Sequence, residues 1–150
     1  MIICISRSTV VGKPRRTLFK ATDAKWVRSL RDIGGKQHGY VTDGPFLYRT
    51  RTGSLLMIWS SFGELKYAVG LAGSMTGKIT GPWEQIDEPL IAANGGHGMI
   101  FKTFDGKLMM TLHQPNSGDI RAQLFELEDT GESLRIRRKW PLPDKKAVFP

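Results

Sequence analysis

Short apolar runs, separated by turns that contain glycine or proline, recur along most of the chain. Runs of this length and spacing are typical of an all-β protein with many short strands rather than of a helical one. The segment 23–40 has no clear period and predicts a connection between sheets. The expected strands cover residues 2–6, 17–20, 46–49, 55–60, 66–72, 83–86, 99–102, 108–113, 120–128 and 133–140.

Two of the expected hairpins are copies of one sequence pattern. The stretches 46–57 and 99–110 share apolar, basic, threonine and glycine positions, and the offset between equivalent positions is constant. Gly53 in one copy and Gly106 in the other supply the positive φ that a tight hairpin loop requires. Because both strands of each hairpin are almost continuously apolar, we expect them to be buried on both faces.

Each hairpin is followed by two further strands, which predicts two units of four antiparallel strands. Four-stranded sheets that repeat radially, with a period of about 50 residues, indicate a β-propeller. About two and a half blades fall short of the roughly four to eight of a closed propeller. We therefore expect either a fragment of a longer protein or self-association through the open blade faces. The expected partial propeller domain has the end of a blade at 1–22, a crossing segment at 23–42, blades at 43–92 and 93–140, and a tail at 141–150.

Composition limits the possible partners. The formal net charge is +8, with basic residues concentrated at 13–16 and 135–139. A positive field attracts polyanions, but no aromatic platform or nucleic-acid motif accompanies it, so a solvated strand face is preferred and nucleic acid is a distant alternative.

A lone Cys4 excludes an internal disulfide framework. No apolar run suits a membrane span. No signal-peptide pattern is present, which leaves a cytoplasmic protein or an exported one whose signal lies on a missing N-terminal part.

The repeat also aligns the residues that open the two inner strands. Asp43-Gly44-Pro45 precedes one inner strand, and Gly96-His97-Gly98 precedes the other. Inner strands line the channel of a propeller, so an acid and an imidazole are expected at neighbouring positions facing one mouth. Both tripeptides are also ordinary turn compositions, which keeps a purely structural role open.

Three motifs stand in a fixed order along the chain. They are Asp43-Gly44-Pro45-Phe46-Leu47-Tyr48, Gly81-Pro82-Trp83-Glu84, and Gly95-Gly96-His97-Gly98-Met99-Ile100 with the following Asp105-Gly106-Lys107 and Leu112-His113. Taken together they resemble glycoside hydrolase family 43, because their order and spacing match over roughly residues 17–128. The resemblance implies a five-bladed β-propeller and an inverting glycosidase that acts on plant polysaccharides such as arabinan or xylan.

In such an enzyme a general acid protonates the leaving oxygen while a base activates water from across the sugar, with the two carboxyls about 6.5–9.5 Å apart. The resemblance makes Asp43 the general acid, at a position where the family usually has the longer Glu. It makes His97 the histidine near the channel centre that in some members belongs to a hydrated metal site, often calcium, and His113 a second histidine at the same mouth. Trp26 and Phe62, in expected loops, are the candidates for stacking on sugar.

The family's other two carboxylates, the base and the residue that tunes the acid, belong to earlier blades. Only Asp23 and Asp32 precede Asp43 among the aspartates, and neither matches a family motif. The chain therefore resembles the C-terminal part of the catalytic domain, and we expect little or no activity from it alone. The alternative is a non-catalytic carbohydrate-binding or scaffold propeller that kept the blades and lost the chemistry.

Overall fold

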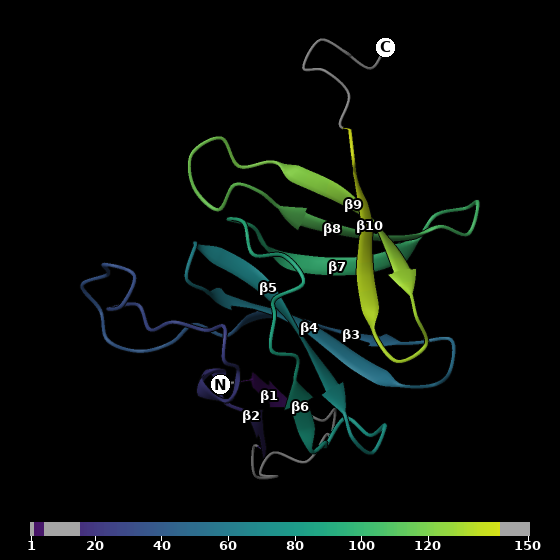
Figure 1. The fold of residues 1–150 in the computed structure, drawn as a ribbon, viewed down its shortest axis with the longest axis horizontal. Coiled ribbons are helices and arrows are strands. Elements are labelled where there is room, and N and C mark those ends of the chain that lie inside the picture. Colours follow the sequence, from purple (N-terminus) through teal and green to yellow (C-terminus); the bar gives the residue numbers. More distant parts are fainter. Residues whose placement is uncertain (1, 5–15, 142–150) are drawn as a thin grey trace, which may run out of the picture.

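The computed structural model describes residues 2–4 and 16–141, which form two four-stranded antiparallel sheets and a two-stranded ribbon (Figure 1). The ribbon pairs β1 (Ile2–Cys4) with β2 (Arg16–Phe19) and is followed by a 3₁₀ turn, η1 (Ala21–Asp23). The sheets have the orders β3-β4-β5-β6 and β10-β9-β8-β7. Their strands are β3 (Asp43–Arg49), β4 (Leu55–Phe62), β5 (Tyr67–Ser74), β6 (Trp83–Gln85), β7 (Gly96–Lys102), β8 (Leu108–His113), β9 (Ala122–Asp129) and β10 (Leu134–Trp140). Among these residues no helix is long and apolar enough to cross a membrane.

The sequence repeat is present strand by strand. β3 and β7 begin and end at equivalent positions of the two copies, and β4 and β8 begin at equivalent positions. Asp43 pairs with Ser60 in the first hairpin and Gly96 pairs with His113 in the second, and a β-bulge follows each of these pairs. The prediction of an all-β fold made of four-stranded antiparallel units is therefore confirmed.

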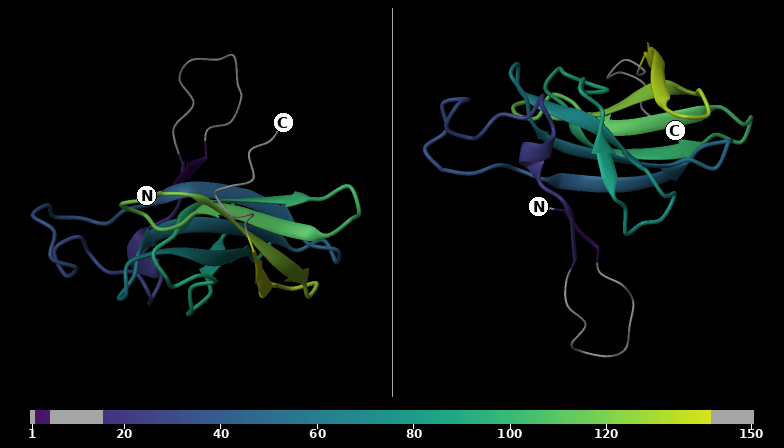
Figure 2. Two further views of the ribbon diagram at one scale, coloured as in Figure 1. Left: turned by 90° about the horizontal axis from the view of Figure 1, so that it is seen from above. Right: turned by 60° about the horizontal axis from the view of Figure 1, so that its bottom comes forward.

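The main hydrophobic core fills the space between the two sheets, which lie face to face (Figure 2). Ile58 and Val69 come from the first sheet, and Met110 and Leu112 from the second. All four side chains are almost inaccessible to solvent. Each such burial stabilises the fold by about 1.5–3 kcal/mol, so the packing of these sheets fixes the relative positions of the strand ends.

A second core lies on the opposite face of the first sheet. Met57 and Trp59 alternate along β4 with the side chains of the main core, and therefore point the other way. Phe19 and Trp26 pack against Trp59, with ring centroids 5.2 and 5.1 Å away. Because β4 serves both cores, every residue of it except Phe62 is buried.

The prediction that both strands of each hairpin are buried on both faces is correct for β4, correct in part for β8, where three of six residues are buried, and wrong for β3 and β7. Side chains alternate between covered and exposed along both of these strands. On β7, Met99 is 57% exposed and Phe101 is 39% exposed. The physical reason is position, because β3 and β7 end their sheets, and one face of β7 is covered by no other sheet of the described residues.

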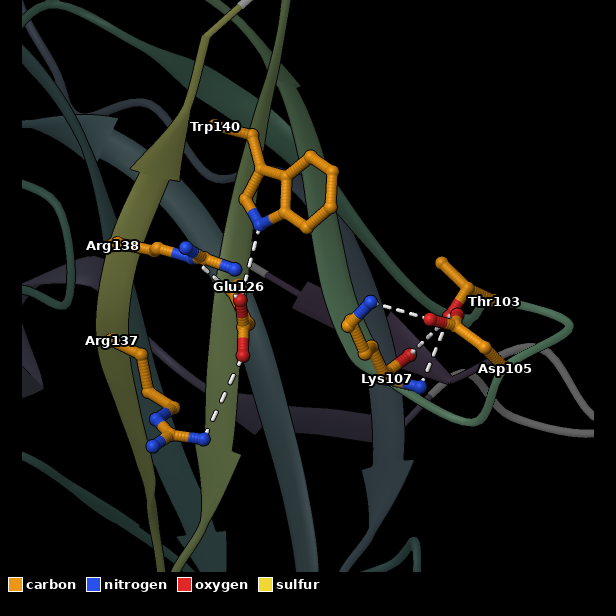
Figure 3. A network of polar contacts seen from close by, with 7 residues as sticks. All are labelled: Thr103, Asp105, Lys107, Glu126, Arg137, Arg138 and Trp140. Atoms are coloured by element: carbon orange, nitrogen blue, oxygen red, sulfur yellow. Dashed lines mark hydrogen bonds and ion pairs between the residues drawn. The ribbon is translucent and has the colours of Figure 1, made fainter.

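The basic run near the C-terminus forms β10, as its partial alternation predicted. Figure 3 shows the Glu126 carboxylate on β9 between Arg137 and Arg138 of β10. Arg138 Nε and Trp140 Nε1 both donate hydrogen bonds to Glu126 Oε2, at 2.8 and 3.1 Å. In the hairpin loop between β7 and β8, Asp105 pairs in the same manner with Lys107. Part of the basic charge is thus balanced within the last sheet.

Candidate functional site

Asp43 and His97 occupy the bulges that open β3 and β7. The residue that follows Asp43 is Gly44, and its counterpart in the second copy of the repeat is His97. Both have the same left-handed backbone, with φ of +50° at Gly44 and +53° at His97. That conformation costs a residue with a side chain about 1–2 kcal/mol. The His97 N–H donates a hydrogen bond to Ser60 Oγ at 3.0 Å, which holds the strained residue in place.

Two glycines allow the strands that carry these residues to approach closely. A Cβ added at Gly44 would lie 2.9 Å from the Cα of His97. A Cβ added at Gly96 would lie 2.1 Å from Cε1 of Tyr67. Neither position has room for a side chain, so the sequence Asp-Gly in one copy and Gly-His in the other packs an acid and an imidazole together. His97 Nε2 lies 3.7 Å from Asp43 Oδ1.

Tyr67 is the residue of this group that the sequence analysis missed. It opens β5, and its hydroxyl reaches across β4 to donate a hydrogen bond to Asp43 Oδ2 at 2.9 Å. The same hydroxyl lies 3.4 Å from His97 Nδ1. Tyr67 is only 3% exposed, and this burial, together with the hydrogen bond to Asp43, raises the pKa of its hydroxyl well above the ordinary value. The group therefore stays protonated and acts as a donor.

His113 and Phe62 complete an aromatic cluster around Tyr67. The His113 ring stacks on the Tyr67 ring at 5.8 Å with an interplanar angle of 14°. Phe62 lies on another side of Tyr67, with ring centroids 5.0 Å apart. His113 Nε2 lies 2.7 Å from Asn116 Oδ1, within hydrogen-bond distance. Four residues predicted from the sequence, Asp43, His97, His113 and Phe62, are thus brought together by a fifth that was not.

A shallow depression adjoins this cluster on the open side of the second sheet. Its volume is about 270 Å³, and both His97 and His113 line it. Met99, Ile120 and Arg121 contribute apolar surface and one charge to its wall. The wall of this depression is therefore partly apolar and partly polar.

Trp26, expected to stack on a sugar, does not join this group. Its indole is 7% exposed and packs in the second core against Trp59. The ring packs against Gly70, where an added Cβ would come within 2.2 Å of Cζ2. Trp26 also borders a separate hollow of about 350 Å³ together with Lys25 and Glu64. The structure therefore gives Trp26 a place in the core and at the edge of another hollow.

The two upstream aspartates do not reach Asp43. Asp23 accepts a hydrogen bond from the N–H of Lys20 at 2.8 Å. Asp32 accepts one from the N–H of Ser29 at 3.2 Å, and hydrogen bonds from Ser29 lower its pKa. Both carboxylates thus close local turns in the segment before β3.

A cation site at His97 is not formed by the described residues alone. Calcium prefers six to eight oxygen ligands, and Asp43 is the carboxylate that faces His97. No group of three or more His, Cys, Asp or Glu side chains within residues 2–4 and 16–141 is placed to hold a metal ion. Calcium stays a prediction that requires ligands from water or from outside this part of the chain.

Comparison with known proteins is informative at the level of structure. No protein-family model and no curated protein sequence matches the chain. An endo-arabinase from Bacteroides thetaiotaomicron is similar with a TM-score of 0.71 and 42% identity, over 78% of this chain and 41% of that one. A thermostable family-43 glycoside hydrolase has a TM-score of 0.58 and 22% identity, over 71% and 39%. An endo-1,4-β-xylanase from Bacteroides thetaiotaomicron has a TM-score of 0.53 and 23% identity, over 64% and 37%.

The fold is thus part of a β-propeller, and the expected resemblance to glycoside hydrolase family 43 is confirmed at the level of fold. The similarity to the second and third structures is one of fold alone. The chain spans about two fifths of the length of the solved structures that it matches.

Proposed function

We propose that this chain is part of an inverting glycoside hydrolase that cleaves arabinan- or xylan-type polysaccharides, with Asp43 as the general acid. The observation that carries the proposal is the geometry of the Asp43 carboxyl group. One oxygen accepts the Tyr67 hydrogen bond, and the other faces His97 without a hydrogen bond at 3.7 Å. The 42% identity with an endo-arabinase makes arabinan the first substrate to test.

In the proposed reaction Asp43 gives its proton to the glycosidic oxygen of the leaving sugar. The bond between that oxygen and the anomeric carbon breaks, and its electron pair goes to the oxygen. Water attacks the anomeric carbon from the opposite face and loses a proton to a second carboxylate, which the resemblance places in an earlier blade. The Asp43 side chain is 46% exposed, so its proton can pass to a bound sugar and be replaced from solvent.

Binding of the sugar is assigned to the cluster beside Asp43. His97 and His113 line the depression of about 270 Å³ and carry ring nitrogens that can hydrogen-bond to sugar hydroxyls. Phe62 is only partly buried and lies at the end of β4, next to Tyr67. Its ring suits stacking on the apolar face of a sugar.

The second candidate function is a carbohydrate-binding propeller without catalysis. It is favoured by the local engagement of Asp23 and Asp32, which leaves Asp43 as the one carboxylate in the described cluster. Binding of arabino-oligosaccharides by calorimetry, with no turnover even in a longer chain that contains the preceding blades, would establish this function instead.

The test compares Asp43→Ala with Asp87→Ala in the full-length protein that contains this chain. Asp87 is an exposed carboxylate that pairs with Lys25, away from the cluster. We expect the Asp43 variant to lose about 10²- to 10⁴-fold in turnover of arabinan, the usual contribution of a general acid, and the Asp87 variant to keep its activity. A fully active Asp43→Ala protein refutes the assignment, and robust turnover by the isolated 150-residue chain refutes the need for a carboxylate from another blade.

A further inference from the structure

We propose that Tyr67 is a positioning residue, which holds Oδ2 of Asp43 and so leaves Oδ1 as the oxygen that carries the transferable proton. This inference rests on the proposed function. Tyr67 approaches Asp43 from β5, two strands away, and no motif in the sequence pointed to it. Its hydroxyl donates to Oδ2 at 2.9 Å, so this oxygen is already occupied as an acceptor.

The other oxygen is the one available to a substrate. Asp43 Oδ1 lies 3.7 Å from His97 Nε2, beyond the range of a hydrogen bond. Both side chains are about half exposed, so this side of the carboxyl group faces solvent. When Asp43 is protonated the proton therefore sits on Oδ1, and when the proton leaves, the hydrogen bond from Tyr67 stabilises the carboxylate that forms.

The surroundings of Tyr67 are built to keep its hydroxyl in place. Its ring lies among Phe62, His97 and His113, with centroid distances between 5.0 and 6.2 Å. The absent side chain of Gly96 leaves the space that Cε1 and Cδ1 of the ring fill. A ring confined on these sides cannot turn away, so the oxygen that it holds is fixed as well.

A second tyrosine gives a matched control. The hydroxyl of Tyr48 on β3 donates to Asp129 Oδ2 at 2.8 Å, the same type of bond in a partly buried setting. Burial raises the pKa of Tyr48, to about 12, and Asp129 adds to the shift. Asp129 is also held by the N–H of Arg51 and lies outside the proposed site. Tyr48→Phe therefore removes an equivalent hydrogen bond without touching Asp43.

The first experiment needs no turnover and uses the 150-residue chain. Tyr67→Phe, Asp43→Ala and the double variant are unfolded in urea, and the changes in stability are compared; alanine is used because an asparagine amide oxygen could still accept the hydrogen bond from Tyr67. If the hydrogen bond exists, the double variant loses clearly less than the sum of the two single losses. Strictly additive losses overturn the proposal at its first step.

The second experiment separates positioning from a merely structural role. The full-length Tyr67→Phe and Tyr48→Phe proteins hydrolyse an arabino-oligosaccharide and its 4-nitrophenyl glycoside, whose leaving group needs little protonation. We expect Tyr67→Phe to slow the first substrate about 10-fold or more and the second less than about 2-fold, while Tyr48→Phe changes neither. An equal loss on both substrates, or no loss, overturns the positioning role. No turnover by the unmodified protein, or full activity of Asp43→Ala, is instead a failure of the proposed function.

Discussion

Gly96 offers the sharpest test of how closely the two inner strands must approach. An alanine Cβ at this position would lie 2.1 Å from Cε1 of Tyr67, whereas ordinary contact begins at 3.4 Å, so the ring would have to withdraw. The ring is almost fully buried and has aromatic neighbours that block retreat. Overpacking of this kind costs about 1–3 kcal/mol, and loss of the hydrogen bond to the charged Asp43 adds about 1.5 kcal/mol or more. We expect Gly96→Ala to lower the free energy of unfolding by about 3 kcal/mol.

The assay is urea unfolding followed by tryptophan fluorescence, with Gly98→Ala as the control on the same strand. An added Cβ at Gly98 meets the flexible ends of Ile58 and Met110 at 3.0 and 3.2 Å, so this variant should lose about 1 kcal/mol or less. For a chain of this size, the loss at Gly96 corresponds to roughly 6–12 °C in Tm. The reasoning is refuted if both variants lose the same amount, or if Gly96→Ala keeps its full effect in a Tyr67→Leu background, where the clash is relieved.

Three further predictions concern the bulge, the last sheet and its open face. Gly44→Ala should lower the free energy of unfolding by about 2 kcal/mol or more, because a left-handed φ is combined with a Cβ contact of 2.9 Å. Gly34 has a φ of +84° and open space around it, so Gly34→Ala measures the effect of the left-handed φ alone. Equal losses of stability in the two variants would show that the contact at Gly44 contributes nothing. The pKa of Glu126 is lowered, first by the hydrogen bond from Trp140. The contribution of Glu126 to stability is therefore complete above its ordinary pKa of 4.5 and is lost as the pH falls through the lower pKa of the folded state. The urea midpoint should fall more steeply with acid for the unmodified chain than for Glu126→Gln, and parallel curves would contradict this. Self-association through the open blade faces, which is the alternative to a fragment, should weaken in Met99→Lys, because Met99 is 57% exposed on β7. Sedimentation over a range of concentrations that shows a monomer for both the unmodified chain and the variant would exclude self-association.

Local pattern and the repeat were sufficient to predict most of the architecture. The constant offset between the two copies aligned their hairpins, and the structure shows the same pairing and the same bulge in both. Turn glycines and apolar runs are local signals, and they predicted each strand of the two four-stranded sheets to within a few residues. Asp43 and His97 were placed at equivalent strand openings by the same alignment, and the structure brings them to 3.7 Å.

The role of Tyr67 and the buried position of Trp26 were not predicted, because both depend on contacts between residues that are distant in the sequence. Tyr67 could have been noticed as a phenol that opens an apolar strand and requires a partner. Its partner, however, depends on the register of β5 against β4 and on the space left by Gly96. Trp26 resembled a loop residue because its segment has no period. Gly70, far along the chain on β5, nevertheless leaves the space in which the indole is buried, because it has no side chain. Such pairings are set by tertiary packing.

The shared bulge has a consequence for how chemistry can be altered in this fold. In each copy the bulge has two positions, occupied by Asp43 and Gly44 in one and by Gly96 and His97 in the other. The second position has the same left-handed backbone in both copies, since φ is +50° at Gly44 and +53° at His97, although the functional side chain stands at the first position in one copy and at the second in the other. The same bulge therefore presents an acid from its first position in one copy and an imidazole from its second in the other, and the close contacts at Gly44 and Gly96 decide which position of each pair stays glycine.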